Sequence, residues 1–369
     1  MKAILKVLVT IILALVLLVG GFVGFLALTE YRPKPVMPVQ LLNQQNKILS
    51  PGEELSITSF NIGYAALDRD TDFFMDGGTM SKGISRERVE ENLSKIMGFL
   101  TGQDSDIYLI QEVDERSTRS YLVNQREHIS SLDGYSSSFG VNYQVGWVPL
   151  PLTEPMGKVL SGILTLSKFE VNETSRHSLP GEYSWPTRLA QLDRCLLETR
   201  IPLTDGKELV IGHIHLSAFD EGGFIRNQQL AFLEQYGREE YSKGNYVVIG
   251  GDWNHLLSTN PEEFRARHSA NWPFWLQILP ANFLEEFQWA FDENIPSNRT
   301  MEAPYNPRTT FVSTIDGFLV SPNIEVVEVR GHNLSFEFSD HNPVTVRLKL
   351  GQGSEEEPQD LVGVEDTDK

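Results

Sequence analysis

The sequence predicts an α/β or α+β fold that follows a single apolar N-terminal helix. Between residues 55 and 350, eight short runs have the alternating or continuously apolar pattern of strands, and only two segments have a clear helical pattern. Many strands interrupted by few helices are typical of these two fold classes. The periodicity leaves open whether the strands are parallel and how many sheets they form.

The N-terminal segment has the length and composition of a membrane span. Lys2 and Lys6 precede 22 residues without a charge, Val7 to Leu28, and ~20 apolar residues suffice to cross a bilayer core. Signal peptides have shorter apolar regions and end in a small-x-small cleavage site, to which Ala27-Leu28-Thr29 is a poor match. We therefore expect residues 1–30 to form an uncleaved transmembrane anchor, with a cleaved, secreted form as the alternative.

The charges around this segment predict a single-pass protein whose remainder lies outside the cell membrane. The basic start favours a cytoplasmic N-terminus, although Arg32 and Lys34 reduce the charge difference. We expect a proline-containing spacer over residues 31–52, which holds the protein off the membrane, and one folded domain over residues 53–350. Residues 351–369 contain seven acidic residues and one lysine, which predicts a disordered acidic tail.

The overall composition excludes several classes of protein. The net charge is −19, from 50 acidic and 31 basic residues, which argues against broad electrostatic binding of nucleic acid. With 40% hydrophobic residues the chain has enough apolar material for a core, so wholesale disorder is excluded. Cys195 is the only cysteine, so the chain can form neither an intrachain disulfide nor a cysteine-built zinc site.

Local patterns define the individual elements. A helix is predicted from Ser85, which can cap its start, to Leu100, with apolar residues on one face. A second helix is predicted from Ile225 to Tyr236, ended by Gly237. The eight predicted strands cover residues 55–60, 106–110, 162–166, 195–201, 209–214, 246–249, 315–320 and 344–350.

Polar side chains lie at the ends of six of these strands. A lone polar residue after a strand is usually a turn residue, but strand ends are also where α/β proteins assemble their sites. Six such ends in one chain favour a site. The residues are Asn61, Gln111-Glu112, His213 to His215, Asp252 to His255, Asp316 and Asp340-His341.

These residue types have the chemistry that phosphoester cleavage requires. Asn61, Glu112 and Asp340 offer hard oxygen ligands, which suit Mg²⁺ or Mn²⁺ rather than zinc. Asp252 could orient or deprotonate water. A metal, a water-positioning carboxylate and histidines together are the equipment for hydrolysis at phosphorus.

Four further residues complete that set. Asn254 could hold a phosphate oxygen, and His215 and His341 could donate to the charge that develops on phosphorus. Asp316 could fix the tautomer of a histidine.

Together, the motifs resemble the endonuclease/exonuclease/phosphatase superfamily of metal-dependent phosphoesterases, which includes deoxyribonucleases and neutral sphingomyelinases. Gly-Asp-x-Asn and Ser-Asp-His-x-Pro are each moderately specific, and their ordered co-occurrence with Gln-Glu is strong. The matching pieces are Ser59-Phe60-Asn61, Gln111-Glu112-Val113, Ser161-Gly162-Ile163-Leu164, His215-Leu216, Gly251-Asp252-Trp253-Asn254, Ile315-Asp316-Gly317-Phe318 and Ser339-Asp340-His341-Asn342-Pro343-Val344.

The resemblance implies a four-layer sandwich of two packed, mostly antiparallel sheets flanked by helices, with the site at one edge and residues 53–350 as the catalytic domain. It implies Mg²⁺, with Mn²⁺ as an alternative, in an environment that contains Asn61, Glu112 and Asp340. The catalytic residues that it implies are His215, Asp252 for positioning water, Asn254 for binding phosphate, His341 for facing the phosphate and Asp316 as the partner of that histidine.

One choice between two histidines and two departures from the family pattern concern the site. His215 is preferred to His213, two residues earlier on the same strand face, because Leu216 completes the His-Leu motif. Gly317 stands where many members carry Tyr or His, which we expect to open the pocket beside Asp316. His255 is atypical for the family, and we expect it to be a loop histidine.

Two other segments and two arginines bear on the substrate. The aromatic-rich segment Phe264–Phe291 is expected to be a helix pair that packs on the sheet, with a lid or an interfacial patch as the alternative. The glycine-rich loop Met75–Gly83 either borders the pocket or is a surface excursion. Arg188 and Arg194 either contact phosphate or form surface ion pairs.

We therefore expect a membrane-anchored, outward-facing, Mg²⁺-dependent hydrolase of a phosphodiester or phosphomonoester, with no obligate protein partner. Lipid head groups, sugar phosphates and extracellular nucleotides all fit as substrates. A cell-surface nuclease of the same superfamily, acting on DNA or RNA, is the alternative. A catalytically inactive binding domain is disfavoured, because no site residue is missing from the sequence.

Overall fold

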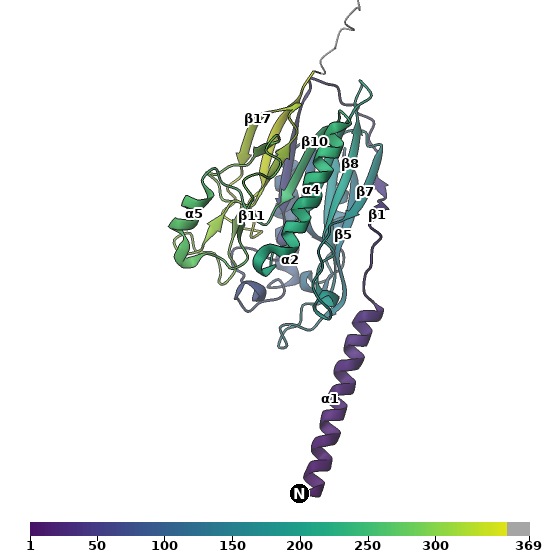
Figure 1. The fold of residues 1–369 in the computed structure, drawn as a ribbon, viewed down its shortest axis with the longest axis vertical. Coiled ribbons are helices and arrows are strands. Elements are labelled where there is room, and N and C mark those ends of the chain that lie inside the picture. Colours follow the sequence, from purple (N-terminus) through teal and green to yellow (C-terminus); the bar gives the residue numbers. More distant parts are fainter. Residues whose placement is uncertain (353–369) are drawn as a thin grey trace, which may run out of the picture.

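A computed structural model describes residues 1–352 of the chain (Figure 1). Two seven-stranded sheets pack face to face, with the strand orders β1-β7-β8-β9-β10-β16-β13 and β17-β18-β3-β4-β6-β5-β2. The predicted acidic tail falls almost entirely on residues 353–369, which lie outside the described residues.

The strand bounds are as follows. The first sheet contains β1 (Val36–Pro38), β7 (Glu173–Ser178), β8 (Cys195–Pro202), β9 (Glu208–His215), β10 (Tyr246–Asp252), β16 (Asp316–Val320) and β13 (Gln288–Ala290). The second contains β17 (Ile324–Gly331), β18 (Val344–Leu350), β3 (Glu54–Asn61), β4 (Ile107–Asp114), β6 (Gly157–Ser167), β5 (Ser136–Val148) and β2 (Leu41–Leu42). Two small pairs are β11 (His255–Leu256) with β12 (Gln277–Ile278), and β14 (Asn298–Arg299) with β15 (Val312–Ser313).

Helices cover the outer faces of both sheets. The α-helices within residues 1–352 are α1 (Lys2–Leu28), α2 (Arg86–Gln103), α3 (Gln125–Ser130), α4 (Phe224–Ser242) and α5 (Pro261–Arg267). One apolar face of α2 packs on the second sheet, and α4 runs along the outer face of the first sheet, over β8 and β10 (Figure 1). A third apolar core lies between the sheets and includes Ile57, Leu109, Ile211, Val248 and Phe318. The predicted four-layer architecture is confirmed.

The structure agrees with the predicted start of one helix and differs from the predicted end of the other. Ser85 caps α2 by accepting a hydrogen bond from the Arg88 backbone N–H at 3.2 Å, as its sequence indicates. The expected end of α4 at Gly237 is wrong, because the helix continues to Ser242. A Cβ at Gly237 would lie 3.3 Å from Leu284 Cδ1, so this glycine permits close packing and does not end the helix.

The segment Phe264–Phe291 is not the helix pair that was expected. It contains the end of α5, a 3₁₀ turn at Ser269–Asn271 and the short strands β12 and β13, and the rest is irregular. Phe283 and Phe287 pack into the core beneath α4, whereas Trp272 and Trp275 belong to a separate cluster around Phe311. The aromatic residues therefore fill two different cores instead of one helical face.

The segment 31–52, expected to be a spacer, packs along the domain. Within it, β1 pairs with β7 and β2 pairs with β5 as antiparallel edge strands, and Leu49 is fully buried. The end of α1 is consequently held against the domain: Leu26 packs beside Val145 and Val148 of β5. By length and composition, α1 is apolar enough to cross a membrane, and it could be a signal or an anchor.

Two parallel strand pairs in the otherwise antiparallel sheets bring the predicted strand ends together. β3 pairs with β4 in parallel, which places Asn61 opposite Gln111, and β9 pairs with β10 in parallel, which places His215 opposite Asp252. β16 runs antiparallel to β10 and starts with Asp316 opposite Asp252. We call this end of the sandwich the site end, and the opposite end, where β3 begins and β18 ends, the far end.

Candidate active site

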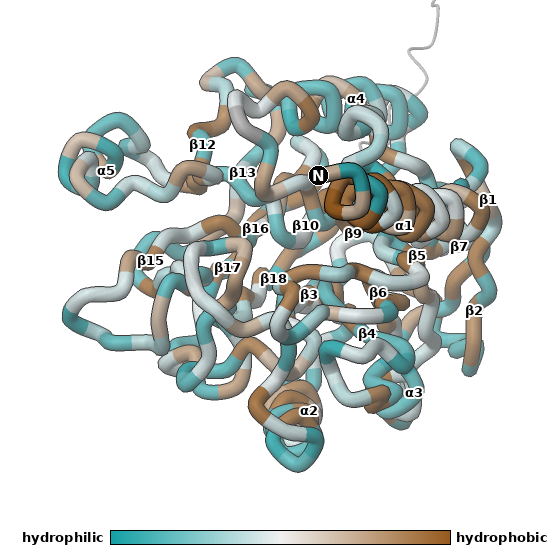
Figure 2. The backbone as a smooth tube through the Cα atoms, turned by 90° about the horizontal axis from the view of Figure 1, so that it is seen from below, coloured by the Kyte–Doolittle hydropathy of each residue, from teal (hydrophilic) through white to brown (hydrophobic). Residues whose placement is uncertain are grey.

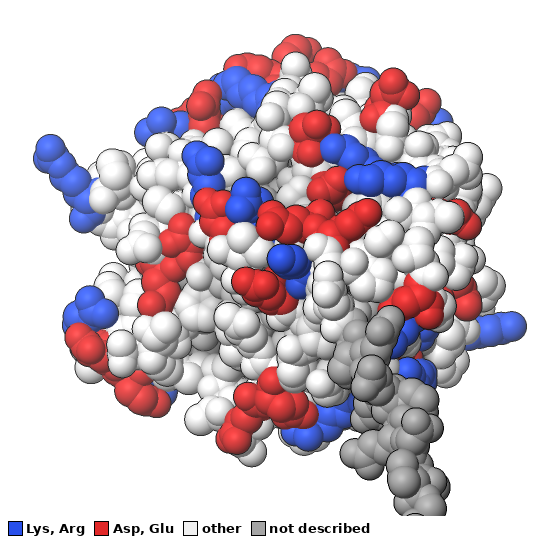
Figure 3. Space-filling model, turned by 90° about the horizontal axis from the view of Figure 1, so that it is seen from above, with Lys and Arg blue, Asp and Glu red and all other residues white. Residues whose placement is uncertain are grey.

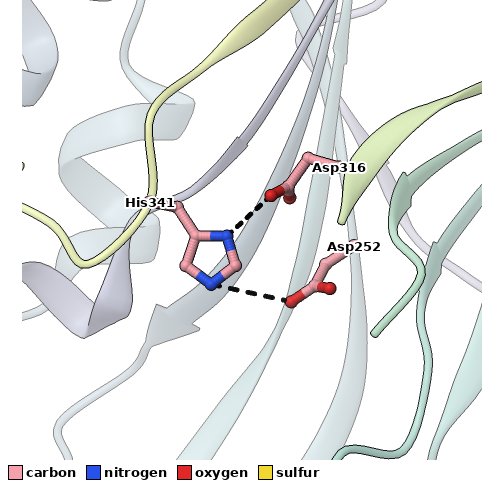
Figure 4. Close-up of side chains that lie close together, drawn as sticks. All are labelled: Asp252, Asp316 and His341. Atoms are coloured by element: carbon pink, nitrogen blue, oxygen red, sulfur yellow. Dashed lines mark hydrogen bonds and ion pairs between the residues drawn. The ribbon is translucent and has the colours of Figure 1, made fainter. Parts of the chain in front are cut away.

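A histidine–aspartate pair forms the most tightly bonded part of the site (Figure 4). His341 Nδ1 lies 2.8 Å from Asp316 Oδ2, and Ser297 Oγ donates to the same carboxylate oxygen at 2.7 Å. Burial opposes protonation of His341, but the charges of Asp316, Asp252 and Asp340 outweigh it and raise the pKa of His341 to about 10. The imidazole is therefore cationic near neutral pH, and Asp316 fixes its orientation.

Asp252 lies at the centre of the cluster. Its Oδ2 accepts a hydrogen bond from Asn61 Nδ2 at 3.1 Å and lies 3.4 Å from His215 Nε2 and 3.9 Å from His341 Nε2. The Asn254 backbone N–H donates to Asp252 Oδ1 at 2.9 Å. Burial, followed by the charge of Asp316, raises the pKa of Asp252 to about 7, which suits a group that exchanges a proton with water at neutral pH.

The two candidate histidines of β9 occupy different environments. His213 is buried between the sheets, where its Nε2 lies 2.7 Å from Gln111 Nε2 and its Nδ1 lies 3.0 Å from Thr165 Oγ1. His215 reaches the site, and its Nε2 lies 4.0 Å from Glu112 Oε1. Burial, then the charge of Arg194, holds the pKa of His215 well below its usual range, so this imidazole is neutral. The structure thus brings His215, and not His213, to the predicted site.

Backbone geometry directs two carboxylates toward the cavity. Glu112 has a left-handed backbone with φ of +55°, at an irregularity in the pairing of β4 with β6. Asp340 packs against Gly63, where a Cβ would lie 2.6 Å from Asp340 Oδ1, so only glycine admits this approach. Burial raises the pKa of Asp340 to about 6, and the charge of Glu112 adds to that effect.

The amides of the site are already engaged. Asn61 Nδ2 also lies 3.3 Å from Glu112 Oε1, and Asn61 Oδ1 accepts a hydrogen bond from the Gly63 backbone N–H at 3.0 Å. Asn254, with φ of +49°, donates from Nδ2 to the Leu216 carbonyl at 2.9 Å. Both side chains are therefore held in place by the backbone before any ligand binds.

The predicted residues surround one cavity of about 250 Å³. Six of the eight line it, namely Glu112, His215, Asp252, Asn254, Asp340 and His341. Asn61 and Asp316 are 1% exposed and lie directly behind Asp252 and His341. The loop Met75–Gly83 borders the cavity through Met75 and Asp76.

Two expectations about the cavity wall are wrong. Gly317 does not open the pocket, because it faces away from it: a Cβ there would lie 2.8 Å from Leu257 Cδ1 and 3.1 Å from Phe291 Cβ. His255 is not a loop histidine, because it is 1% exposed, begins β11 and has its Nδ1 2.7 Å from the Trp253 carbonyl oxygen.

The two arginines singled out in the sequence separate in the structure. Arg188 pairs with Glu30 at 3.3 Å and Glu182 at 3.2 Å and does not line the cavity. Arg194 lines the cavity, and its Nη1 has no hydrogen-bond partner within the described residues. Burial lowers the pKa of Arg194. An unpaired cationic N–H beside acidic groups is suited to receive an anion.

Further cavity residues carry no motif that could have predicted them. Arg119 forms two hydrogen bonds to Asp114, at 2.9 and 3.1 Å, and its guanidinium lies 3.7 Å from the centre of the Tyr64 ring. Asn298 Nδ2 lies 3.0 Å from His341 Nε2. The contacts of Arg119 with Tyr64 and of Asn298 with His341 join residues far apart in the sequence, so local patterns contain no signal for them.

Donor atoms of Asp252, Asp316 and His341 all lie within 4.8 Å of one another, so this buried group could hold a metal ion. The short His341–Asp316 hydrogen bond occupies one pair of its donor atoms (Figure 4). Glu112 and Asp340 face the same cavity and supply a second set of hard oxygen donors.

Comparisons with known proteins identify the family of the chain. Residues 59–341 match the model of the endonuclease/exonuclease/phosphatase family, and the chain belongs to that family. No curated protein matches the chain.

Solved structures of low sequence identity share the fold. An endonuclease/exonuclease/phosphatase from Beutenbergia cavernae is 18% identical with a TM-score of 0.54, over 81% of this chain and 72% of that one. ANGEL2, a 2′,3′-cyclic phosphatase solved with adenosine-2′,3′-vanadate, is 16% identical with a TM-score of 0.53, over 86% and 99%. The human Nocturnin catalytic domain with bound sulfate is 15% identical with a TM-score of 0.50, over 85% and 99%.

Proposed function

We propose that this protein is a membrane-anchored, outward-facing phosphoesterase that requires Mg²⁺, or Mn²⁺ in its place. The observation that carries the proposal is the meeting of a cationic His341, a neutral His215 and the carboxylate of Asp252 in the lining of one cavity. Such a set can position water on one side of a phosphoryl group and stabilise charge on the other.

The acidic residues support a divalent cation. Glu112 and Asp340 face the cavity, and their mutual repulsion contributes to the raised pKa of Asp340; a bound cation would relieve this repulsion. We assign the ion to Glu112 and Asp340, with Asn61 beside them, because Asp316 and His341 are already bonded to each other. When bound, the ion would supply Lewis-acid polarisation of a phosphoryl oxygen.

The protein's own residues then have distinct tasks. Asp252, held by Asn61 and the Asn254 backbone, accepts a proton from the attacking water. His341 donates from Nε2 to the phosphoryl group, while Asp316 keeps its Nδ1 side occupied. Arg194 offers its unpaired Nη1 to a second phosphate oxygen.

The cellular placement rests on the N-terminal helix. We propose that α1 is retained as a single-pass anchor, because its apolar run is longer than a signal peptide requires and its end packs on β5. Lys2 and Lys6 precede the span, which favours an extracytoplasmic catalytic domain.

A substrate panel tests the reaction. The full-length protein with Mg²⁺ is assayed against bis-4-nitrophenyl phosphate, 4-nitrophenyl phosphate, plasmid DNA and RNA. Asp252→Ala and His341→Ala should each lower turnover of the preferred substrate by ~10² to ~10⁴-fold with cooperative unfolding retained. Asp104→Ala, an acidic residue at the far end whose side chain is 75% exposed, is the matched control. Retained turnover in both cavity variants would disprove the assignment.

A further inference from the structure

Large apolar side chains are exposed around the mouth of the cavity. Each belongs to a segment at the site end, and each is at least half exposed. We call them the apolar rim: Leu150 (50%), Leu152 (83%), Trp185 (62%), Phe224 (74%) and Phe274 (65%). Leu150 also lines the cavity, and Phe274 packs at 5.9 Å between ring centres against Phe219, which lines it too. At Leu150 and Phe274 the rim is therefore continuous with the cavity wall.

The apolar rim comes from four separate segments. Leu150 and Leu152 lie on the β5–β6 hairpin, and Trp185 lies between β7 and β8. Phe224 begins α4, and Phe274 lies between α5 and β12. Isolated exposed apolar residues are ordinary on protein surfaces, but several around one opening indicate an interaction site.

The apolar helix α1 leaves the domain at this same end (Figure 1). Its last turns pack against β5 and the 3₁₀ turn Thr187–Ala190, which follows Trp185. Glu30, two residues after α1, pairs with Arg188 of that turn at 3.3 Å. Viewed from below, α1 points toward the viewer from beside β5 (Figure 2). A bilayer that contains α1 would therefore lie against the site end.

The cavity walls match a ligand with both a polar and an apolar part. Its lining includes the polar groups of His341, Asp252 and Arg194 together with many apolar side chains. The apolar lining includes Phe73, Leu150, Met156, Leu192, Trp275 and Met301. A nucleic-acid strand would instead need cationic contacts along its backbone or stacking contacts with its bases. Arg188, the cation beside the rim, is already paired with two carboxylates.

We propose that the apolar rim inserts into the interfacial layer of the membrane that holds α1, and that the cavity takes the phosphate of a membrane phospholipid whose chains remain at the rim. Tryptophan and phenylalanine favour this layer, and leucine favours the acyl boundary. The proposal rests on the proposed phosphoesterase function and adds the source and class of its substrate.

Insertion is measured directly through Trp185. The full-length protein is reconstituted into phosphatidylcholine vesicles in which part of the lipid is brominated near the top of its chains. The wild-type protein should lose more fluorescence than Trp185→Phe, and the difference reports contact of Trp185 with lipid. Equal quenching in the two proteins would show that the rim stays out of the bilayer and serves another partner, which overturns the proposal.

The consequence for catalysis is tested with two diesters that share a leaving group. One is bis-4-nitrophenyl phosphate in solution, and the other is hexadecyl 4-nitrophenyl phosphate in the same vesicles. Leu152→Glu and Trp185→Glu should each lower kcat/KM for the membrane-resident ester by about 10-fold, the effect of losing one buried apolar contact. Hydrolysis of the soluble ester should not change.

Ile48→Glu is the matched control, because Ile48 is 51% exposed and lies at the far end, beside the bridges Lys47–Phe169 and Leu49–Leu203. If the rim variants hydrolyse both esters as the wild type does, the membrane proposal fails and the phosphoesterase function stands. If the wild type hydrolyses neither ester with Mg²⁺, the proposed function itself fails.

Discussion

The two ends of the sandwich differ in where their charged and apolar side chains lie. At the site end, carboxylates and histidines are buried close together, residues such as Glu112 and Asn254 have left-handed backbones, and large apolar side chains face outward. The far end carries acidic and basic side chains on its surface (Figure 3). There Lys168 pairs with Asp104 at 2.7 Å, and Arg200 pairs with Glu208 at 2.6 Å.

This contrast separates function from stability. The site end tolerates like charges, unusual backbone and exposed apolar surface, each of which costs folding free energy unless a ligand or a membrane compensates. The far end neutralises its charges within the protein. Substitutions at the site end should therefore change activity far more than stability. Substitutions in the Arg200 cluster, which consists of Arg200 and its partners Glu198, Glu208 and Glu240, should do the reverse.

The largest expected effect concerns Asp316, which lies behind the cavity. Asp316→Asn should lower kcat by ~10² to ~10⁴-fold, because His341 loses the carboxylate that orients it and stabilises its cationic form. The pH profile should move with it: the limb that reports loss of the His341 proton should shift to lower pH. An unchanged kcat and profile would remove Asp316 from the mechanism.

A smaller effect is expected at Arg194. Arg194→Gln removes a charge-assisted hydrogen bond to the substrate, so kcat/KM should fall by ~10 to ~100-fold. Arg194→Lys, which keeps the charge, should recover part of this loss. If inorganic phosphate inhibits wild type and Arg194→Gln equally well, Arg194 does not contact the phosphate.

The smallest effect on activity is expected at Glu198, in the Arg200 cluster. Burial opposes ionisation of Glu198, but hydrogen bonds, including that from Tyr236 Oη at 2.6 Å, and the charge of Arg200 lower its pKa to about 2. Its stabilising contribution is therefore complete above the ordinary pKa of about 4.5 and is lost as the pH falls toward 2.

Glu198→Gln should accordingly reduce the free energy of unfolding by roughly 1–3 kcal/mol at pH 7 and flatten its dependence on pH below 4.5. Chemical unfolding monitored by circular dichroism across this range measures both. Turnover per folded molecule should be unchanged, and a loss of turnover at full stability would contradict the division between the two ends.

The sequence predicted the strands that carry the site because their apolar runs end in polar residues. Asn61, His215 and Asp252 end their strands and Asp316 begins one. Glu112 lies two residues before the end of β4, and His341 lies three residues before β18. The parallel pairs that gather them depend on long-range contacts, so periodicity could not establish their proximity, and the family resemblance was needed for it.

Other parts of the molecule were missed for physical reasons. β5 was not predicted because Ser136, Ser137, Ser138 and Gly140 have low strand propensity, yet its long ladder with β6 buries them. The aromatic segment suggested one helical face, whereas its side chains fill two cores. Arg119 and Tyr64 stack on each other in the cavity lining through tertiary packing alone.

The proposed function depends on a catalytic divalent cation held by the acidic groups of the site end. The direct measurement is hydrolysis of bis-4-nitrophenyl phosphate by the full-length protein after exhaustive treatment with EDTA, then after addition of Mg²⁺. We expect chelation to lower the rate by at least ~100-fold and Mg²⁺ to restore it. In Glu112→Gln, Mg²⁺ should not restore the rate. A chelated protein that keeps its full rate would contradict the account.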